Sequence, residues 1–319
     1  MAPLHPGVKQ YVDRILAAPP VWEMTLEEAR QATDAETFEV WGELDEVAFV
    51  EDREADGVRV RVYRPDGAEP LPAIVYLHGG GWVVGSIESH DPLCRALAAR
   101  TPAVVVSVDY RLAPEHPFPA AVDDAWTATR WVAEHASELG ADPAAVVVAG
   151  DSAGGNLAAV VAIRARGRRP ALALQVLIYP VTDQDLDSPG YERFGVALNL
   201  TRAKMEWYWR QYAADAEATH TDASPLRAPA LSGVAPALVQ TAEHDPLCYE
   251  AAEYARRLQD AGVPVTLTCY DGQIHGFVRL RTLCGPAADE AIAEIAQAVR
   301  RAASQAARRS PRSRPASPY

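Results

Sequence analysis

Short runs of β-branched and aliphatic residues recur along the middle of the chain. They cover residues 73–77, 104–108, 145–149, 174–179, 237–241 and 265–270. Strands that are apolar at every position are buried on both faces of a sheet. Helical patterns lie between most of these runs, for example over 121–139 and 249–261. Alternating strands and helices predict an α/β fold with a mostly parallel, doubly wound sheet of about eight strands.

The residues before this core follow other patterns. Val8, Tyr11, Val12 and Ile15 fall on one stripe of a helix, so residues 1–45 are predicted to be a helical segment. An antiparallel pair of strands is expected next, over 46–50 and 58–63, with the charged residues 51–57 between them. Domains of this class and length commonly stay single, so 46–300 is assigned to one domain.

One stretch breaks the alternation, because residues 183–221 separate two strands with far more chain than a crossover helix needs. The stretch is rich in aromatic residues. It is interpreted either as a cap over an apolar pocket or as an insertion whose aromatics pack onto the body. On the first interpretation, the pocket walls are expected to include Trp82, Phe194, Leu198 and Trp207.

Charge is unevenly distributed along the chain. The 319 residues carry a formal net charge of -13, which argues against nucleic acid as a partner, since phosphate contacts need a basic face. From residue 300 onward, however, there are six Arg and no acidic residue. Because the last residues are rich in Pro, Ser and Arg, 301–319 is predicted to be a disordered tail.

The sequence also suggests where the protein works. No apolar run is long enough to span a bilayer and no N-terminal secretory pattern is visible, so a cytoplasmic location is expected. The cysteines show no metal-ligand spacing and are too few for a disulfide scaffold, which favours reduced thiols and no metal site. They are Cys94, Cys248, Cys269 and Cys284.

A Gly-x-Ser-x-Gly pentad follows the run 145–149 and begins a helix of small residues. Its central residue, Ser152, has only small neighbours at Gly150, Ala153 and Gly154. A serine on a sharp turn from strand to helix needs such neighbours, and the turn exposes its hydroxyl above the sheet. Ser152 is therefore the candidate nucleophile.

A second glycine-rich segment follows the run 73–77. Its three consecutive glycines leave backbone N–H groups free to stabilise a developing oxyanion, and the expected donors are Gly79, Gly80 and Ala153. A phosphate-binding loop is the alternative interpretation, but neither the Gly-x-Gly-x-x-Gly nor the Gly-x4-Gly-Lys-Ser/Thr pattern is present.

A serine nucleophile needs a base, and the base needs an acid that orients it. His275 follows the last core strand and can reach the pentad from there, so it is the candidate base. Asp245 follows the strand 237–241 and gives the chain order Ser, Asp, His. Asp183 and Glu243 remain alternative acids.

These residues resemble the hormone-sensitive-lipase-like family of α/β-hydrolases, the bacterial family IV esterases. The resemblance covers about residues 40–300 and rests on 78–82 (HGGGW), 109–121 (DYRLAPEHPFPAA), 150–156 (GDSAGGN), 245–247 (DPL) and 275–277 (HGF). The family usually continues its acid motif with Arg and Asp, where this chain has Cys248 and Tyr249. That departure puts the supporting contacts of the acid in doubt.

The resemblance implies an α/β-hydrolase fold with a helical cap, which the N-terminal helices help to form with Val12 and Trp22 near the pocket. It implies carboxylic ester hydrolysis with no metal or organic cofactor, and a homodimer paired through the strand 265–270. The candidate triad predicts an acyl-enzyme intermediate, and because no strongly apolar interfacial segment is visible, esters of short to medium acyl chains are expected. Alternatives on the same fold are an amidase, formamidase or lactonase, or a small-molecule receptor. The intact Ser152, Asp245 and His275 argue against the receptor.

Overall fold

The computed structural model describes residues 1–67, 70–213 and 220–309. At its centre is an eight-stranded sheet in the order β1-β2-β4-β3-β5-β6-β7-β8. The strands are β1 (Phe49–Ala55), β2 (Val58–Arg64), β3 (Leu71–Leu77), β4 (Val104–Val108), β5 (Ala141–Asp151), β6 (Leu174–Ile178), β7 (Ala237–His244) and β8 (Val265–Ile274). The pairs β1–β2 and β2–β4 are antiparallel and the others are parallel. The predicted fold class is confirmed.

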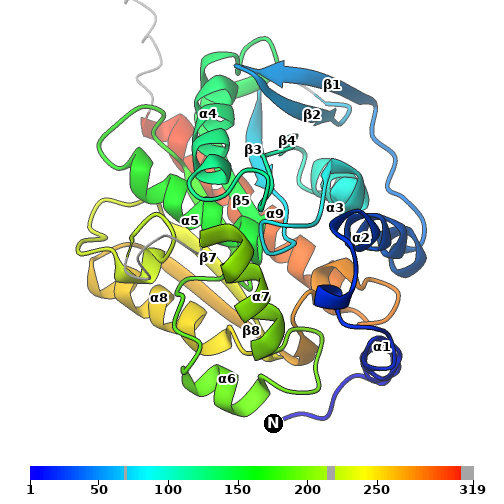
Figure 1. The fold of residues 1–319 in the computed structure, drawn as a ribbon. Helices are drawn as coiled ribbons and strands as arrows, with labels where there is room; N and C mark the ends of the chain where they lie inside the picture. Colours follow the sequence, from blue (N-terminus) through cyan, green and yellow to red (C-terminus); the bar gives the residue numbers. More distant parts are fainter. Residues whose placement is uncertain (68–69, 214–219, 310–319) are drawn as a thin grey trace, which may run out of the picture.

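Helices cover both faces of the sheet (Figure 1). They are α1 (Pro6–Leu16), α2 (Leu26–Trp41), α3 (Ile87–Arg100), α4 (Ala120–Glu134), α5 (Ala153–Ala165), α6 (Pro189–Phe194), α7 (Arg202–Ala213), α8 (Cys248–Asp260) and α9 (Ala287–Arg309), with 3₁₀ turns η1 (Val21–Glu23), η2 (Pro225–Arg227) and η3 (Phe277–Arg279). One face packs on α4, α5 and α8 through residues such as Val122, Leu157 and Leu258. The other packs on α3 and α9 through Leu97 and Ile292.

The parallel strands place three chain segments at one edge of the sheet. β5 ends at Asp151, β7 at His244 and β8 at Ile274, and each is followed by a predicted site residue. Carboxyl ends of parallel strands meet at the same edge, where ligands bind in open α/β sheets. Helix α7 lies over this part of the molecule, and α1 and α2 lie to one side of it (Figure 1).

The first hairpin differs from its prediction. β1 covers Phe49–Ala55, so most of the charged stretch expected to be a loop is strand, and only Asp56 and Gly57 form the turn. Both turn residues have positive φ, which suits the tight hairpin turn that Asp-Gly favours. Charged residues are tolerated here because β1 is the outermost strand of the sheet and faces water.

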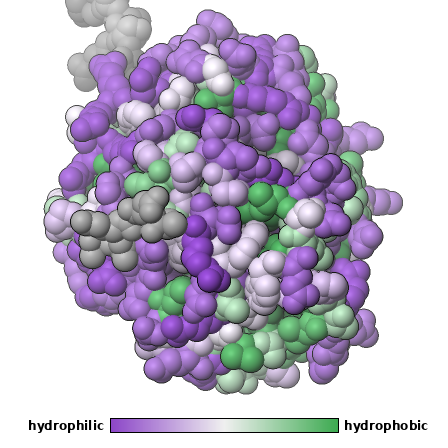
Figure 2. Space-filling model, viewed as in Figure 1, coloured by the Kyte–Doolittle hydropathy of each residue, from purple (hydrophilic) through white to green (hydrophobic). Residues whose placement is uncertain are grey.

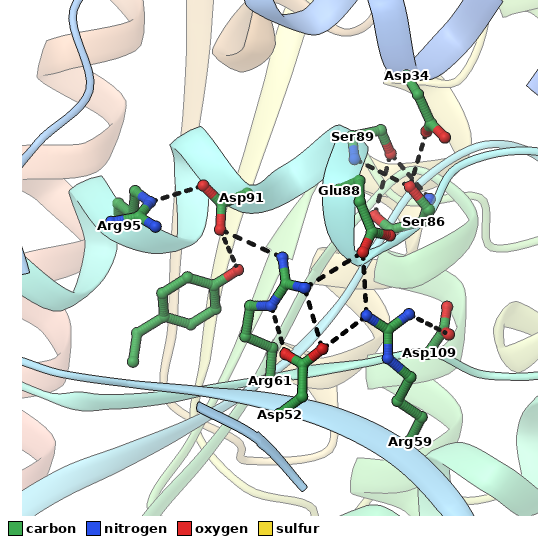
Figure 3. Close-up of polar contacts among 11 residues, drawn as sticks. Asp34, Asp52, Arg59, Arg61, Ser86, Glu88, Ser89, Asp91, Arg95 and Asp109 are labelled. Atoms are coloured by element: carbon green, nitrogen blue, oxygen red, sulfur yellow. Dashed lines mark hydrogen bonds and ion pairs between the residues drawn. The ribbon is translucent and has the colours of Figure 1, made fainter. Parts of the chain in front are cut away.

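Ion pairs across the hairpin compensate for the low apolar content of β1 (Figure 3). Asp52 accepts hydrogen bonds from Arg61 at 2.5 Å and from Arg59 at 2.7 Å. Arg61 also contacts Glu88 at 3.2 Å and Asp91 at 3.6 Å, both on α3. The hairpin is thereby attached to the helix that packs behind the glycine-rich loop.

We expect Asp52→Asn to lower the free energy of unfolding by about 1 kcal/mol at pH 7, a value reduced for solvent screening because the side chain is 42% exposed. Hydrogen bonds from Arg61, with a smaller contribution from Arg59, lower the pKa of Asp52 to about 2. The unfolded value is near 3.9, so this stabilisation is complete above about pH 4 and is lost as the pH falls towards 2.

Urea titrations of wild type and variant at pH 7 and pH 3 measure this difference. The exposed Asp66→Asn provides the matched control, since Asp66 forms no ion pair within the described residues. A difference between wild type and Asp52→Asn that is as large at pH 3 as at pH 7 would contradict the assignment.

The C-terminal prediction needs correction. Helix α9 runs to Arg309, so residues 301–309, expected to be disordered, are helical. Ala302 is buried in the core beside Val299, which explains why the helix continues past the start of the Arg-rich segment. Residues 310–319 of the predicted tail lie outside the described residues.

The face that carries α7 is mostly hydrophilic (Figure 2). Its apolar side chains lie mainly in the lower half of that view, near α1 and α6. Leu16, at the end of α1, and Val196, just after α6, are among the large apolar side chains that remain exposed. Within the residues described, none of the helices combines the length and apolar character that a bilayer span requires.

Candidate active site

Ser152 lies on a sharp turn between β5 and α5. Its φ is 55° and its ψ is -117°, a conformation that non-glycine residues rarely adopt. The turn fits only because its neighbours are small: a Cβ on Gly150 would collide with the Gly154 carbonyl, and one on Gly154 with the Leu77 carbonyl. The local sequence thus allows a strained turn that presents the Ser152 hydroxyl at the edge of the sheet.

The structure brings Ser152, His275 and Asp245 together. His275 Nε2 lies 2.8 Å from Ser152 Oγ, and His275 Nδ1 lies 2.8 Å from Asp245 Oδ2. Asp245 is fully buried and the other two are nearly so. An ionised carboxylate only accepts hydrogen bonds, so the proton of a neutral His275 sits on Nδ1 and leaves Nε2 free to accept from the serine.

A backbone hydrogen bond helps to hold the carboxylate of Asp245. Its Oδ1 accepts a hydrogen bond from the Leu247 N–H at 2.9 Å. This contact needs no particular side chain at positions 248 and 249, where the sequence departs from the family pattern. The departure therefore leaves the orientation of Asp245 intact.

The alternative acids are used elsewhere. Asp183 forms an ion pair with Arg227 at 2.7 Å. Glu243 accepts a hydrogen bond from the Gly272 N–H at 2.9 Å. Asp245 is the carboxylate that contacts the His275 ring within the described residues.

One of the predicted oxyanion donors, Gly79 in the glycine-rich loop, is wrong. The Gly79 N–H donates to Asp151 Oδ1 at 2.9 Å, so it is not free for a ligand. The next two glycines line the pocket beside Ser152, with φ of +122° at Gly80 and +59° at Gly81. A Cβ on Gly81 would collide with the ring of Tyr208 on α7. The N–H groups available at the site are those of Gly80, Gly81 and Ala153, the first residue of α5.

Asp151 is buried beneath this loop as an anchor that the sequence did not reveal. It accepts hydrogen bonds from the Tyr76 hydroxyl at 2.8 Å and from Gly79, and it lies 3.2 Å from His90 Nε2. Burial alone would raise the pKa of Asp151, but His90, Arg279 and the hydrogen bonds outweigh burial and lower it. Asp151 is therefore a carboxylate that fixes the loop against the turn of Ser152.

Two histidines, His90 and His78, also support the glycine-rich loop. His90, on α3, also contacts Ser89 Oγ at 2.9 Å through Nδ1. His78 stacks on the ring of Tyr110 with centroids 4.2 Å apart, and burial lowers the pKa of His78 to about 3, so it is neutral. No sequence motif pointed to His90, because only the packing of α3 brings it under the loop.

A pocket of about 120 Å³ opens beside Ser152. Its walls come from the two N-terminal helices, from α7 and the residues before it, and from the loops that carry the site. They are formed by Tyr11, Thr33, Glu36, Val40, Gly80, Gly81, Val84, Asp151, Ser152, Tyr179, Asn199, Leu200, Lys204, Met205, Tyr208, His275, Gly276, Arg279 and Leu280. Most of this wall could not be assigned from local sequence motifs, because only Gly80, Gly81, Asp151, Ser152, His275 and Gly276 belong to them.

The four predicted pocket residues lie elsewhere, and those expectations are wrong. Trp82 is fully buried and stacks on Tyr212 with centroids 4.2 Å apart. Phe194 packs edge-on against His244. Leu198 packs against the core on the α3 and α9 side, and Trp207 against the core on the α5 side.

Helical geometry explains the error on α7. Lys204, Met205 and Tyr208 share the face that lines the pocket, because residues four apart lie above one another on a helix. Trp207 falls outside that face. On α1 the pocket residue is Tyr11, whereas Val12 is buried in the core and Trp22, in η1, is 43% exposed.

Within the described ranges, no three His, Cys, Asp or Glu side chains are arranged as a metal site. The chemistry available from the side chains is that of a hydroxyl, an imidazole and a carboxylate in line, with free N–H groups beside the hydroxyl.

The chain is similar in sequence to known proteins. The model of a family described by its alpha/beta hydrolase fold matches residues 74–279. The chain is 46% identical over 251 residues to NlhH, a carboxylesterase of Mycobacterium tuberculosis, across 77% of this chain and 78% of that protein. It is 38% identical over 313 residues to an ethyl acetate hydrolase of Pseudomonas putida, across 93% of this chain and 98% of that one.

A solved esterase structure is also similar to this chain. The hyperthermophilic esterase from the archaeon Pyrobaculum calidifontis is similar with a TM-score of 0.87 and 42% sequence identity. The match covers 94% of this chain and 99% of that chain.

Proposed function

Because the chain belongs to the α/β-hydrolases, in their hormone-sensitive-lipase-like branch, we propose that Ser152, His275 and Asp245 are its catalytic triad. The protein is a carboxylic ester hydrolase. The observation that carries the residue assignment is the pair of 2.8 Å contacts that join the three side chains in line. The amide, lactone and receptor alternatives are not favoured by relatives that are esterases.

In the proposed reaction, Ser152 Oγ attacks the ester carbonyl while His275 Nε2 takes the serine proton. The carbonyl oxygen becomes an oxyanion, which accepts hydrogen bonds from the N–H groups of Gly80, Gly81 and Ala153. When the intermediate collapses, the C–O bond to the alcohol breaks and His275 returns the proton to the leaving oxygen. Asp245 holds the ring and stabilises its positive charge.

The second half of the reaction repeats these steps with water. His275 takes a proton from a water molecule, which attacks the acyl-Ser152 carbonyl at the same oxyanion position. Collapse then releases the carboxylic acid and returns the proton to Ser152 Oγ. No group beyond this chain's own residues and water is needed to balance the two steps.

We propose that the preferred acyl chains are short to medium. The small pocket volume supports this, as do the polar side chains in its wall. We also propose that residues 1–45 and 183–221 act as a cap, since Tyr11 and Glu36 from the first segment and Lys204 and Tyr208 from the second line the pocket.

Hydrolysis of p-nitrophenyl esters from acetate to palmitate tests this proposal, with wild type and Ser152→Ala prepared side by side. We expect kcat/KM to be highest among the short and medium chains and to fall for palmitate, because a small pocket cannot bury a long chain. Rates that rise steadily to palmitate would contradict the acyl preference. Turnover that survives in the variant would contradict the triad.

The proposal extends to the cellular location and the oligomeric state of the protein. We propose a cytoplasmic location, supported by four cysteines that are all free. We also propose a homodimer paired through β8, the last strand of the sheet, whose outer edge has no neighbouring strand in the described part of the chain. Sedimentation velocity distinguishes the dimer from a monomer.

A further inference from the structure

Two basic side chains line the pocket beside Ser152. Lys204 comes from the cap helix α7, and Arg279 comes from η3, four residues after His275. Neither forms an ion pair within the residues that the structure describes. Cations without partners in a partly closed pocket are costly, because desolvation is not offset by an opposite charge.

Lys204 is held close to the catalytic base. Its Nζ donates to the Asn199 carbonyl at 3.3 Å, and the Asn199 side chain donates to the His275 carbonyl at 3.0 Å. Burial lowers the pKa of Lys204 below the usual range of a lysine. A bound anion would raise this pKa again, because an opposite charge favours the charged form.

Arg279 has donor groups to spare. It donates one hydrogen bond, from Nη2 to Thr37 Oγ1 at 2.5 Å, and its Nε is buried without an acceptor among the described residues. A guanidinium carries five N–H donors in a planar fork, which suits a carboxylate.

The carboxylates near these cations are occupied. Glu36, on α2, accepts a hydrogen bond from Tyr11 at 3.2 Å and pairs with Arg14 at 3.4 Å. Asp151 points into its buried network below the glycine-rich loop. Glu36 and Asp151 act on Lys204 and Arg279 through longer-range electrostatics, so within the described residues the pocket wall holds two cations that are not directly paired with a carboxylate.

We infer that the preferred substrates are short esters with a free carboxylate, which Lys204 and Arg279 bind while Ser152 attacks the ester carbonyl. This inference rests on the proposed ester hydrolysis at Ser152 and adds the substrate class. Half-esters of short dicarboxylic acids have this chemistry, because one carboxyl is esterified and the other is ionised. The size of the pocket limits the spacing to a few bonds between the two groups.

The test uses pairs of substrates that differ only in a carboxylate against a methyl group. Monomethyl glutarate and methyl pentanoate place the difference on the acyl side. The acetate ester of 3-hydroxypropanoate and propyl acetate place it on the alcohol side. Acid release in a pH-stat gives kcat/KM for each, and the quantity compared is the ratio of the anionic to the neutral ester.

We expect this ratio to exceed one for wild type in one of the two pairs, and that pair identifies the side that carries the charge. An ordinary apolar pocket gives a ratio well below one, because burying a carboxylate without a partner is costly. Lys204→Gln and Arg279→Gln should each lower the ratio roughly tenfold or more, as expected for lost hydrogen bonds to a charged group.

Matched variants separate this effect from general changes. Lys204→Arg keeps the charge and should retain most of the ratio, whereas Arg210→Gln removes an exposed charge from the same helix and should leave it unchanged. Lys204→Gln carries the test if Arg279→Gln melts below the assay temperature, since the hydrogen bond that Lys204 donates among the described residues is the long one to the Asn199 carbonyl.

The possible outcomes distinguish failure of the inferred substrate class from failure of the proposed ester hydrolysis. A ratio below one in both pairs, or a ratio that Lys204→Gln leaves unchanged, overturns the inference while the ester hydrolase stands. Absence of Ser152-dependent turnover of methyl pentanoate and propyl acetate, with both anionic esters also inert, overturns the proposed function itself.

Discussion

Replacing Ser152 with alanine is expected to lower kcat by about 10⁶-fold on any ester the protein hydrolyses, as loss of the serine does in other triads. The reason is geometric: without Oγ, His275 Nε2 has no nucleophile at 2.8 Å to activate, and no acyl-enzyme can form. Free N–H groups and the pocket remain, so a small residual rate over water should persist. Single-turnover measurements with p-nitrophenyl acetate detect both values.

The control for this variant is Ser304→Ala, which removes an exposed serine hydroxyl near the end of α9 that donates a hydrogen bond to the Arg300 carbonyl. It should keep the wild-type rate. Circular dichroism would establish that Ser152→Ala is folded. Near-normal turnover by a folded Ser152→Ala variant would reject Ser152 as the nucleophile.

Asp245→Asn is expected to lower kcat by about 10⁴-fold, the loss seen when a triad acid is replaced in this way. An amide NH₂ facing His275 Nδ1 forces the proton onto Nε2, so the ring can no longer accept from Ser152. Asparagine keeps the size and the Leu247 contact available to Oδ1, so we expect the fold to survive. Steady-state kinetics at pH 7 measure the change.

Asp183→Asn is the matched control, because Asp183 is also a buried aspartate near the carboxyl edge of the sheet but pairs with Arg227. It should reduce stability and leave kcat within about tenfold of wild type, since no reacting group touches it. A loss in Asp183→Asn as large as in Asp245→Asn would show that the acid was wrongly assigned.

The sheet could be predicted from the sequence because its inner strands are apolar at every position, a pattern that needs no knowledge of neighbours. β1 could not, since its Asp52 is stabilised by Arg59 and Arg61 on β2, which in turn pair with Glu88 on α3. The contacts with Glu88 join segments far apart in the chain. An edge strand of this kind is recognisable only when its partners are known.

The candidate triad could also be predicted from local patterns. Each of Ser152, Asp245 and His275 comes directly after a strand, so topology alone brings them to one edge. The pocket wall depends instead on which face α7 turns inward and on where α1 and α2 pack. Neither is written in a local motif, and the prediction for Trp207 failed for that reason. His90 was missed because a lone histidine on a helix gives no sign of what lies beneath it.

The contact between Gly81 and the ring of Tyr208 has a consequence for protein engineering. Tyr11, Glu36 and Lys204 lie on helices outside the sheet, so libraries at these positions can alter substrate range without moving the groups that break the bond. Tyr208 cannot be varied so freely, because its ring occupies the space beside Gly81 that a Cβ on residue 81 would fill. A search for new specificity should therefore treat residues 81 and 208 as one unit and randomise the other three separately.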